Sequence, residues 1–163
     1  MMPILINYNP YTLALFDSVW NGPGSNPNRV YITSKKLLFL GLNWYNDDSY
    51  DGFAVKKPNE KVNDMGWDMR PIRIEETLVR LYNRYQLPIL ITENGLADGD
   101  DSDSEWWLSE TLQALEHAEA AGVDLMEYLH WPAFDNFEWD KGYWPRFGLI
   151  AVEIGRTSCR ERV

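Results

Sequence analysis

The sequence predicts an α/β fold built from repeated strand–helix units. Three short apolar runs, at residues 37–43, 88–92 and 125–131, have the length of strands buried on both faces. Two longer segments with helical periodicity separate them, and this alternation is typical of a parallel sheet. A closed barrel needs about eight strands. The pattern by itself therefore allows either a small open α/β domain or a slice of something larger.

The N-terminal part carries few structural signals. Residues 1–33 lack periodicity, and the turn formers Asn-Gly-Pro-Gly-Ser-Asn-Pro-Asn at 21–28 predict a loop. The first apolar run, Leu37–Asn43, is the first expected strand, and a long polar loop follows it as far as Trp67.

The first expected helix begins near Pro71, a residue suited to a first helical turn. Glu75 and Glu76 favour its positive end. The helical stripe consists of Ile74, Leu78, Leu81 and Tyr82. The run Pro88–Thr92 is the second expected strand.

The second expected helix follows an acidic turn at residues 98–103, in which the ligand spacing of a calcium loop is absent. We interpret that turn as solvated. Ser102-Asp-Ser-Glu105 matches a capping box, and Gly122 is expected to end the helix. The apolar stripe consists of Trp107, Leu108, Thr111, Leu112, Leu115 and Ala118. Residues 125–131 form the third expected strand.

Composition narrows the function classes. The formal charge of −10 disfavours nucleic-acid binding. One cysteine, Cys159, and two histidines argue against a metal centre, and no cofactor is indicated. No apolar run approaches the roughly 20 residues that span a bilayer, and no signal peptide is visible, so we expect no membrane partner and a cytoplasmic location. Eight Trp residues favour a surface that stacks on sugar rings.

Each expected strand ends in a polar or aromatic residue. Asn43 and Tyr45 follow the first strand, Glu93 the second, and Trp131 ends the third. Because parallel strands bring their carboxyl ends to one edge, these side chains are candidates for a shared pocket. From spacing alone, Glu93 could equally cap the next loop.

Four motifs in order resemble family 1 glycoside hydrolases, the β-glucosidase family. Residues 91–95 (Ile-Thr-Glu-Asn-Gly) match its nucleophile motif, and 39–45 resemble its strand-six motif. Residues 130–139 resemble the strand-eight motif, and 142–149 the closing signature. The likeness covers roughly residues 37–153.

The resemblance implies a C-terminal portion, about strands 6 to 8, of a (β/α)8 TIM barrel. It also implies a retaining β-glycosidase, most simply a β-glucosidase acting on a β-glycoside or oligosaccharide. Such enzymes use two carboxylates, one as nucleophile and one as acid and then base. Glu93 matches the nucleophile, and Tyr45 matches the tyrosine that donates a hydrogen bond to it.

The same resemblance assigns the substrate-binding residues. Glu138 and Trp139 match residues that hold sugar hydroxyls, and Trp131 matches the platform beneath the sugar ring. Phe147 and Asn43 match further pocket positions. The alternatives are core packing for Trp131 and Trp139 and a rim salt bridge for Glu138.

The partner acid is missing from the sequence. The family carries it in an Asn-Glu-Pro motif, which does not occur in these 163 residues. We therefore expect a partial barrel domain at 34–153 that lacks the N-terminal half of the barrel and is inactive alone. Residues 1–33 match the family poorly. The basic stretch 154–163 resembles translated adapter sequence, so it is expected to be a non-native tail.

Two other hypotheses remain. The chain could be a non-catalytic carbohydrate-binding module that uses the aromatic residues and Glu138 without chemistry. It could also fail to fold stably alone, because three of eight strands leave exposed sheet edges.

Overall fold

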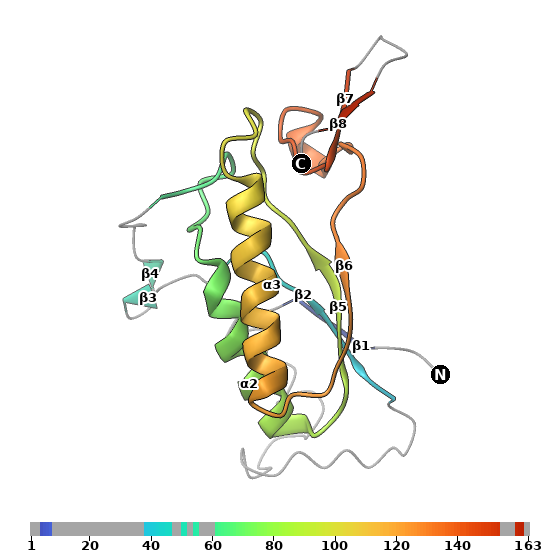
Figure 1. Ribbon diagram of the computed structural model, residues 1–163. Coiled ribbons are helices and arrows are strands. Elements are labelled where there is room, and N and C mark those ends of the chain that lie inside the picture. The colour runs from blue at the N-terminus through green and yellow to red at the C-terminus, as the bar shows by residue number, and fades with distance from the viewer. Residues whose placement is uncertain are drawn as a thin grey trace.

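A parallel sheet of four strands forms the centre of the computed structural model (Figure 1). The structure describes residues 38–46 and 61–153 in full, together with the backbone of residues 4–7, 50–51, 54–55 and 159–161. The sheet order is β1 (Ile4–Asn7), β2 (Leu40–Asn43), β5 (Ile89–Asn94) and β6 (Leu125–His130). The last three are the strands expected from the sequence. β1 was not predicted, and it lies in the segment 1–33 that carried few signals.

The sheet order is also the chain order, so each crossover advances in the same direction. Right-handed crossovers that all advance one way place every helix on one face of the sheet. Figure 1 shows this arrangement, with α2 (Ile74–Tyr85) and α3 (Ser104–Ala120) packed together beside β5 and β6. A doubly wound sheet would carry helices on both faces, whereas the described helices lie on one face, as the helices of a barrel do.

The first helix begins as predicted. Pro71 opens a 3-10 turn, η1 (Pro71–Arg73), which leads directly into α2. The helix buries the stripe residues Ile74, Leu78 and Leu81 against the sheet. It ends at Gln86, whose φ of 51° is left-handed and whose N–H donates to the Tyr82 carbonyl at 2.8 Å.

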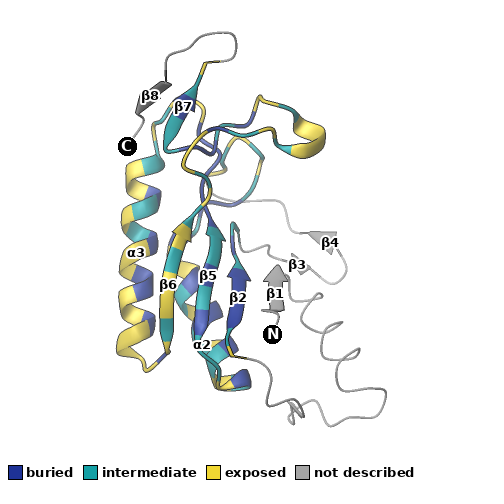
Figure 2. Ribbon diagram, turned by 90° about the vertical axis from the view of Figure 1, so that its right-hand side faces the viewer, coloured by how far each residue is buried: buried dark blue, intermediate teal, exposed yellow. Residues whose placement is uncertain are grey.

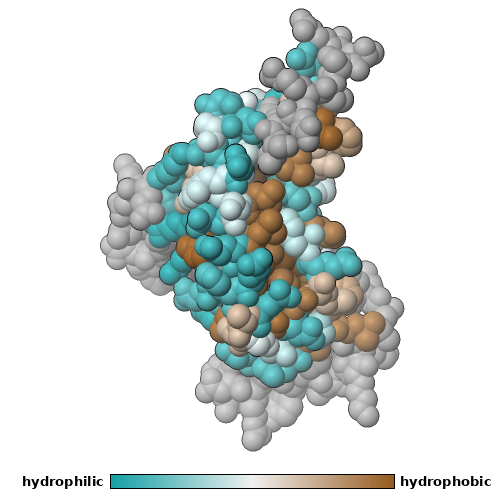
Figure 3. Space-filling view, viewed as in Figure 1, coloured by the Kyte–Doolittle hydropathy of each residue, from teal (hydrophilic) through white to brown (hydrophobic). Residues whose placement is uncertain are grey.

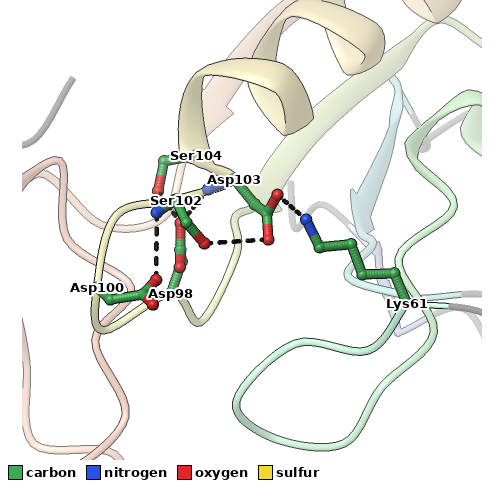
Figure 4. Close-up of polar contacts among 6 residues, drawn as sticks. All are labelled: Lys61, Asp98, Asp100, Ser102, Asp103 and Ser104. Carbon is green, nitrogen blue, oxygen red and sulfur yellow. Dashed lines mark hydrogen bonds and ion pairs between the residues drawn. The ribbon is translucent and has the colours of Figure 1, made fainter.

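The start of α3 corrects two predictions (Figure 4). Ser102 does not cap the helix: the helix begins after Asp103, whose own side chain makes no capping bond. Instead, Oδ2 of Asp98 accepts the Asp103 N–H and the Ser104 hydroxyl, each at 2.8 Å. Asp98 is 7% exposed, so it is buried and not a solvated residue of an open turn. Lys61 forms an ion pair with Asp103 across the same turn.

The end of α3 confirms Gly122 as the stop. Its φ is 95°, its N–H donates to the Glu119 carbonyl, and the Val123 N–H donates to Ala118. This pair of hydrogen bonds is a Schellman motif. The buried stripe differs from the prediction at three positions, because Leu112 is 42% exposed, Leu108 is only half-buried, and Ala114 is buried although it was not predicted. The buried positions are Trp107, Thr111, Ala114, Leu115 and Ala118.

The core lies between the helices and one face of the sheet. Leu42 and Ile91 are at most 1% exposed, and Trp44 stacks on Trp107 with ring centroids 6.1 Å apart. β6 differs from the prediction of a fully buried strand, since Met126 is 51% exposed and Leu129 46%. The reason is its place in the sheet: β6 is an edge strand (Figure 2). Figure 3 shows a band of hydrophobic side chains between α3 and the strands β5 and β6.

Short elements complete the structure. β3 (Tyr50–Asp51) pairs with β4 (Ala54–Val55), and η2 (Trp139–Lys141) lies in the loop after β6. β7 (Ile150–Val152) pairs antiparallel with β8 (Cys159–Glu161). β8 lies in residues 154–163, and the non-native origin of that stretch stays a prediction. No helix within the described residues has the length and apolar character needed to cross a membrane.

Candidate active site

Tyr45 and Glu93 meet where β2 and β5 end. The register places Asn43 opposite Glu93, and the Trp44 N–H donates to the Glu93 carbonyl at 2.9 Å. Tyr45 then lies beside the carboxylate, and its hydroxyl donates to Glu93 Oε2 at 2.9 Å. The structure therefore joins the two residues that the sequence paired as nucleophile and hydrogen-bond donor.

The Tyr45 hydroxyl is held in its protonated form. Burial is the largest cause that raises the pKa of Tyr45 far above its ordinary value, and the charge and hydrogen bond of Glu93 raise it further. The charge of the Glu138 carboxylate raises the pKa of Tyr45 a little further, so Glu138 lies within electrostatic range of this hydroxyl. At neutral pH the phenol can only act as a donor toward Glu93.

An aromatic cluster supports this pair. The Tyr45 ring meets Phe147 edge-on at 5.9 Å and lies 6.0 Å from Trp67, and Trp67 lies 6.1 Å from Phe147. Phe147 is 4% exposed. The sequence placed Phe147 in the pocket but did not single out Trp67, which ends an aperiodic loop. Its one available signal was an isolated aromatic residue shortly before the helix.

Asn43 is connected to the site by a hydrogen bond with Thr92, the residue before Glu93. Its Oδ1 accepts the Thr92 hydroxyl at 2.5 Å. This bond connects the last residue of β2 to the residue that precedes the candidate nucleophile. Asn43 therefore links the end of β2 to the end of β5.

The loop after β6 carries the other candidate residues. The Glu138 carboxylate accepts a hydrogen bond from Asn136 Nδ2 at 2.9 Å. The backbone N–H of Glu138 donates to the Gly142 carbonyl at 2.7 Å. Trp139 has a φ of 46° and is 83% exposed, while Trp131 is 38% exposed. In this chain Trp139 is therefore not packed in a core, whereas Trp131 is partly covered, and core packing stays an alternative for Trp131. Trp139 itself points to solvent and is not gathered with Tyr45 and Glu93.

A buried carboxylate holds this loop together. Asp135 accepts from Arg146 Nη1 at 3.0 Å, from the Gly148 N–H at 3.1 Å and from the Val152 N–H at 3.0 Å. A Cβ on Gly148 would lie 2.2 Å from the Asp135 nitrogen, so only glycine fits there. These contacts place Phe147, which lies between Arg146 and Gly148, against Tyr45. The sequence did not identify Asp135 as important.

The arrangement places carboxylates where they can act as nucleophile or hydrogen-bond acceptor toward a neutral ligand. It offers one carboxylate oriented by a phenol, a second carboxylate nearby, and an aromatic wall. Within the described residues, no three His, Cys, Asp or Glu side chains are grouped to hold a metal ion. Such a site suits attack on, and stabilisation of, a centre that develops positive charge.

Comparison with known proteins gives a consistent result. The sequence profile of glycosyl hydrolase family 1 matches residues 32–163. The chain is 34% identical to a β-galactosidase of Sulfolobus acidocaldarius, over 77% of the chain and 25% of the relative. It is 35% identical to a galactolipid galactosyltransferase of Arabidopsis thaliana, over 80% of the chain and 22% of that protein.

Solved structures agree with the sequence relatives. The β-glucosidase of Pyrococcus furiosus superposes with a TM-score of 0.78 at 26% identity, covering 98% of this chain and 39% of that one. The chain spans about a quarter of the length of the two curated relatives. The described fold is therefore a partial α/β piece that is similar to barrel β-glucosidases.

Proposed function

The chain belongs to glycosyl hydrolase family 1, and from this we propose that it carries the nucleophile half of a retaining β-glycosidase site. The observation that supports this most strongly is the 2.9 Å hydrogen bond from the Tyr45 hydroxyl to Glu93 Oε2. In this proposal β2, β5 and β6 are strands six, seven and eight of the barrel. The residues that end them then face the sugar.

The proposed reaction has two steps. The Glu93 carboxylate forms a bond to the anomeric carbon while the bond from that carbon to the aglycone oxygen breaks, and the electron pair leaves with the aglycone. Water then attacks the anomeric carbon and loses a proton to a base outside these residues or to solvent, while the bond from that carbon to Glu93 breaks and the electron pair returns to the carboxylate. The sugar leaves with its original configuration. Tyr45 keeps one Glu93 oxygen hydrogen-bonded and thereby directs the other toward the anomeric carbon.

Glu138 and the indoles are proposed to bind the sugar. A carboxylate accepts hydrogen bonds from sugar hydroxyls, and Asn136 already fixes the orientation of Glu138. The exposed faces of Trp131 and Trp139 suit stacking and N–H donation to a ligand that covers them. β-Glucosides and β-galactosides are the proposed substrates, since relatives include enzymes named for each.

The acid that protonates an ordinary leaving group is proposed to come from the part of the barrel that these residues lack. We therefore expect the 163 residues alone to be inactive on ordinary glycosides and to cleave only those whose aglycone leaves without protonation. An example is 2,4-dinitrophenyl β-glucoside, with methyl β-glucoside as the substrate that should resist.

The test measures dinitrophenolate release by the chain with azide present. Release that yields the β-glucosyl azide, and that is lost in Glu93→Gln, supports the proposal, because two inversions retain configuration. Binding of the glycoside without release would favour the carbohydrate-binding module. Release that is unchanged in Glu93→Gln would contradict the assignment of the nucleophile.

A further inference from the structure

A network of buried and half-buried hydrogen bonds links the ends of three neighbouring strands next to the candidate nucleophile. Asn94 Nδ2 donates to the Trp44 carbonyl at 2.6 Å, and Tyr128 donates its hydroxyl proton to Asn94 Oδ1 at 2.9 Å. The Tyr128 oxygen lies 3.0 Å from His130 Nδ1. Asn94 is 0% exposed and Trp44 1%. The residues come from β5 and β6 and from the segment that follows β2.

The donor and acceptor of each hydrogen bond in this network follow from the Trp44 carbonyl at one end. The Trp44 carbonyl can only accept, so the Asn94 amide must present its NH₂ group to it and its oxygen to Tyr128. That oxygen also only accepts, so it takes the single hydroxyl proton of Tyr128. The Tyr128 oxygen can then only accept from His130, and the proton must lie on Nδ1. Burial lowers the pKa of His130, so its ring is neutral at pH 7 and Nε2 is bare.

The backbone ladder is irregular at this point. The pairing of β2 with β5 shifts register between Leu42 and Asn43, and that of β5 with β6 shifts between Ile91 and Asn94. The Trp44 N–H still donates to the Glu93 carbonyl there, so the Asn94 side chain adds a second link between the same two strand ends. Asn94 follows Glu93 in sequence, and Trp44 precedes Tyr45. The hydrogen bond from the Asn94 side-chain amide to the Trp44 carbonyl thus joins the sequence neighbours of Glu93 and Tyr45.

We propose that Asn94 is a positioning residue that keeps the Tyr45 hydroxyl on Glu93, with its amide oriented by Tyr128 and, through Tyr128, by His130 as the Nδ1–H tautomer. The effect of Asn94 on catalysis rests on the proposed function, whereas its hydrogen bonds to Trp44 and Tyr128 do not. Asn94 touches neither the substrate nor the reacting atoms. It acts by joining two strand ends where the register of the ladder shifts.

The tautomer can be tested in the unaltered 163-residue chain. Nitrogen-15 NMR of the imidazoles should show His130 with a protonated Nδ1 and a bare Nε2 at pH 7. The second imidazole is assigned with His117→Gln, since His117 lies exposed on α3. A His130 ring protonated on Nε2 would overturn the proposal, because Nδ1 would then compete with Asn94 for the Tyr128 proton.

The positioning role is tested with Tyr128→Phe, which removes one hydroxyl and keeps the ring. The carbon-13 resonance of the Tyr45 Cζ, assigned with Tyr45→Phe, reports the hydrogen bond to Glu93. It should move in Tyr128→Phe and in Asn94→Leu, while Tyr82→Phe, a partly buried tyrosine of α2, leaves it unchanged. A Tyr45 resonance unmoved in both variants would overturn the proposal, and amide spectra confirm that each variant is folded.

Turnover gives an independent readout. Loss of one positioning hydrogen bond should lower dinitrophenolate release in Tyr128→Phe about tenfold, with KM little changed. Wild-type release in Tyr128→Phe would overturn the positioning role. If the unaltered chain releases nothing, the proposed function is in question, while the two NMR tests still decide the geometry of Asn94.

Discussion

The main chain of Gly95 is pressed against that of Trp131: a Cβ at position 95 would lie 2.0 Å from the Trp131 carbonyl oxygen. The contact joins the residue two places after Glu93 to the residue that follows β6, and the Trp131 N–H donates to the Asn94 carbonyl at 2.8 Å. Glycine is therefore required by close backbone approach, and not by a left-handed φ.

Gly95→Ala should lower the free energy of unfolding by about 3 kcal/mol, because backbone must shift to admit the methyl group. Gly122→Ala is the matched control. A Cβ there has open space, and its φ of 95° adds only conformational strain, about 1 kcal/mol. Urea denaturation of both variants measures the difference. Equal losses would show that the Gly95 contact is relaxed in solution.

Tyr45→Phe should slow dinitrophenolate release about 10- to 100-fold, because a hydrogen bond to a charged group contributes about 1.5–3 kcal/mol. The variant keeps the ring contacts with Phe147 and Trp67, so folding should be little affected. Tyr82→Phe provides the comparison for loss of a hydroxyl elsewhere. A rate equal to that of the unaltered chain would mean that the phenol does not orient Glu93.

Stability should fall as pH rises above about 10, the ordinary pKa of tyrosine. Burial raises the pKa of Tyr45 and of Tyr128 in the folded state, with the Glu93 charge as a further cause for Tyr45. Above pH 10 the unfolded chain therefore binds fewer protons than the folded one, and the free energy of unfolding decreases with pH. Thermal unfolding between pH 8 and 11 measures the slope. The slope should be shallower in Tyr45→Phe and in Tyr128→Phe; an unchanged slope in both would contradict this origin.

Asp135→Ala should destabilise the chain by about 3–5 kcal/mol, because it leaves the Arg146 charge and two backbone N–H groups without their carboxylate. Asp140→Ala is the control, since its side chain is 79% exposed and forms an ion pair with its neighbour Lys141. That control should leave the unfolding midpoint unchanged. A small effect of Asp135→Ala would show that the loop is held by other contacts.

The sequence was most informative where the signal is local. Apolar runs located β2, β5 and β6, and Pro71 and Gly122 located helix ends. The resemblance of two motifs to the family paired Glu93 with Tyr45. The order of parallel strands follows from those elements, because right-handed crossovers allow few alternatives.

Features that depend on distant partners were missed. Trp67 joins the site through rings 22 and 80 residues away in sequence, and neither spacing nor periodicity encodes such contacts. Asp98 accepts the Asp103 N–H at the start of α3 although it lies five residues upstream. Ser102 is nearer in sequence and matched the capping-box pattern, so it was predicted as the cap instead. The exposure of β6 depends on its place at the sheet edge, which a strand's own residues do not reveal.

The central claim is that Glu93 becomes covalently glycosylated. The most direct test is incubation with 2,4-dinitrophenyl 2-deoxy-2-fluoro-β-glucoside, followed by mass spectrometry of the labelled peptides. One fluoroglucosyl group on the peptide that carries Glu93, absent in Glu93→Gln, is the expected result. A label on Glu138 instead, or dinitrophenolate release with no labelled peptide, would contradict the account.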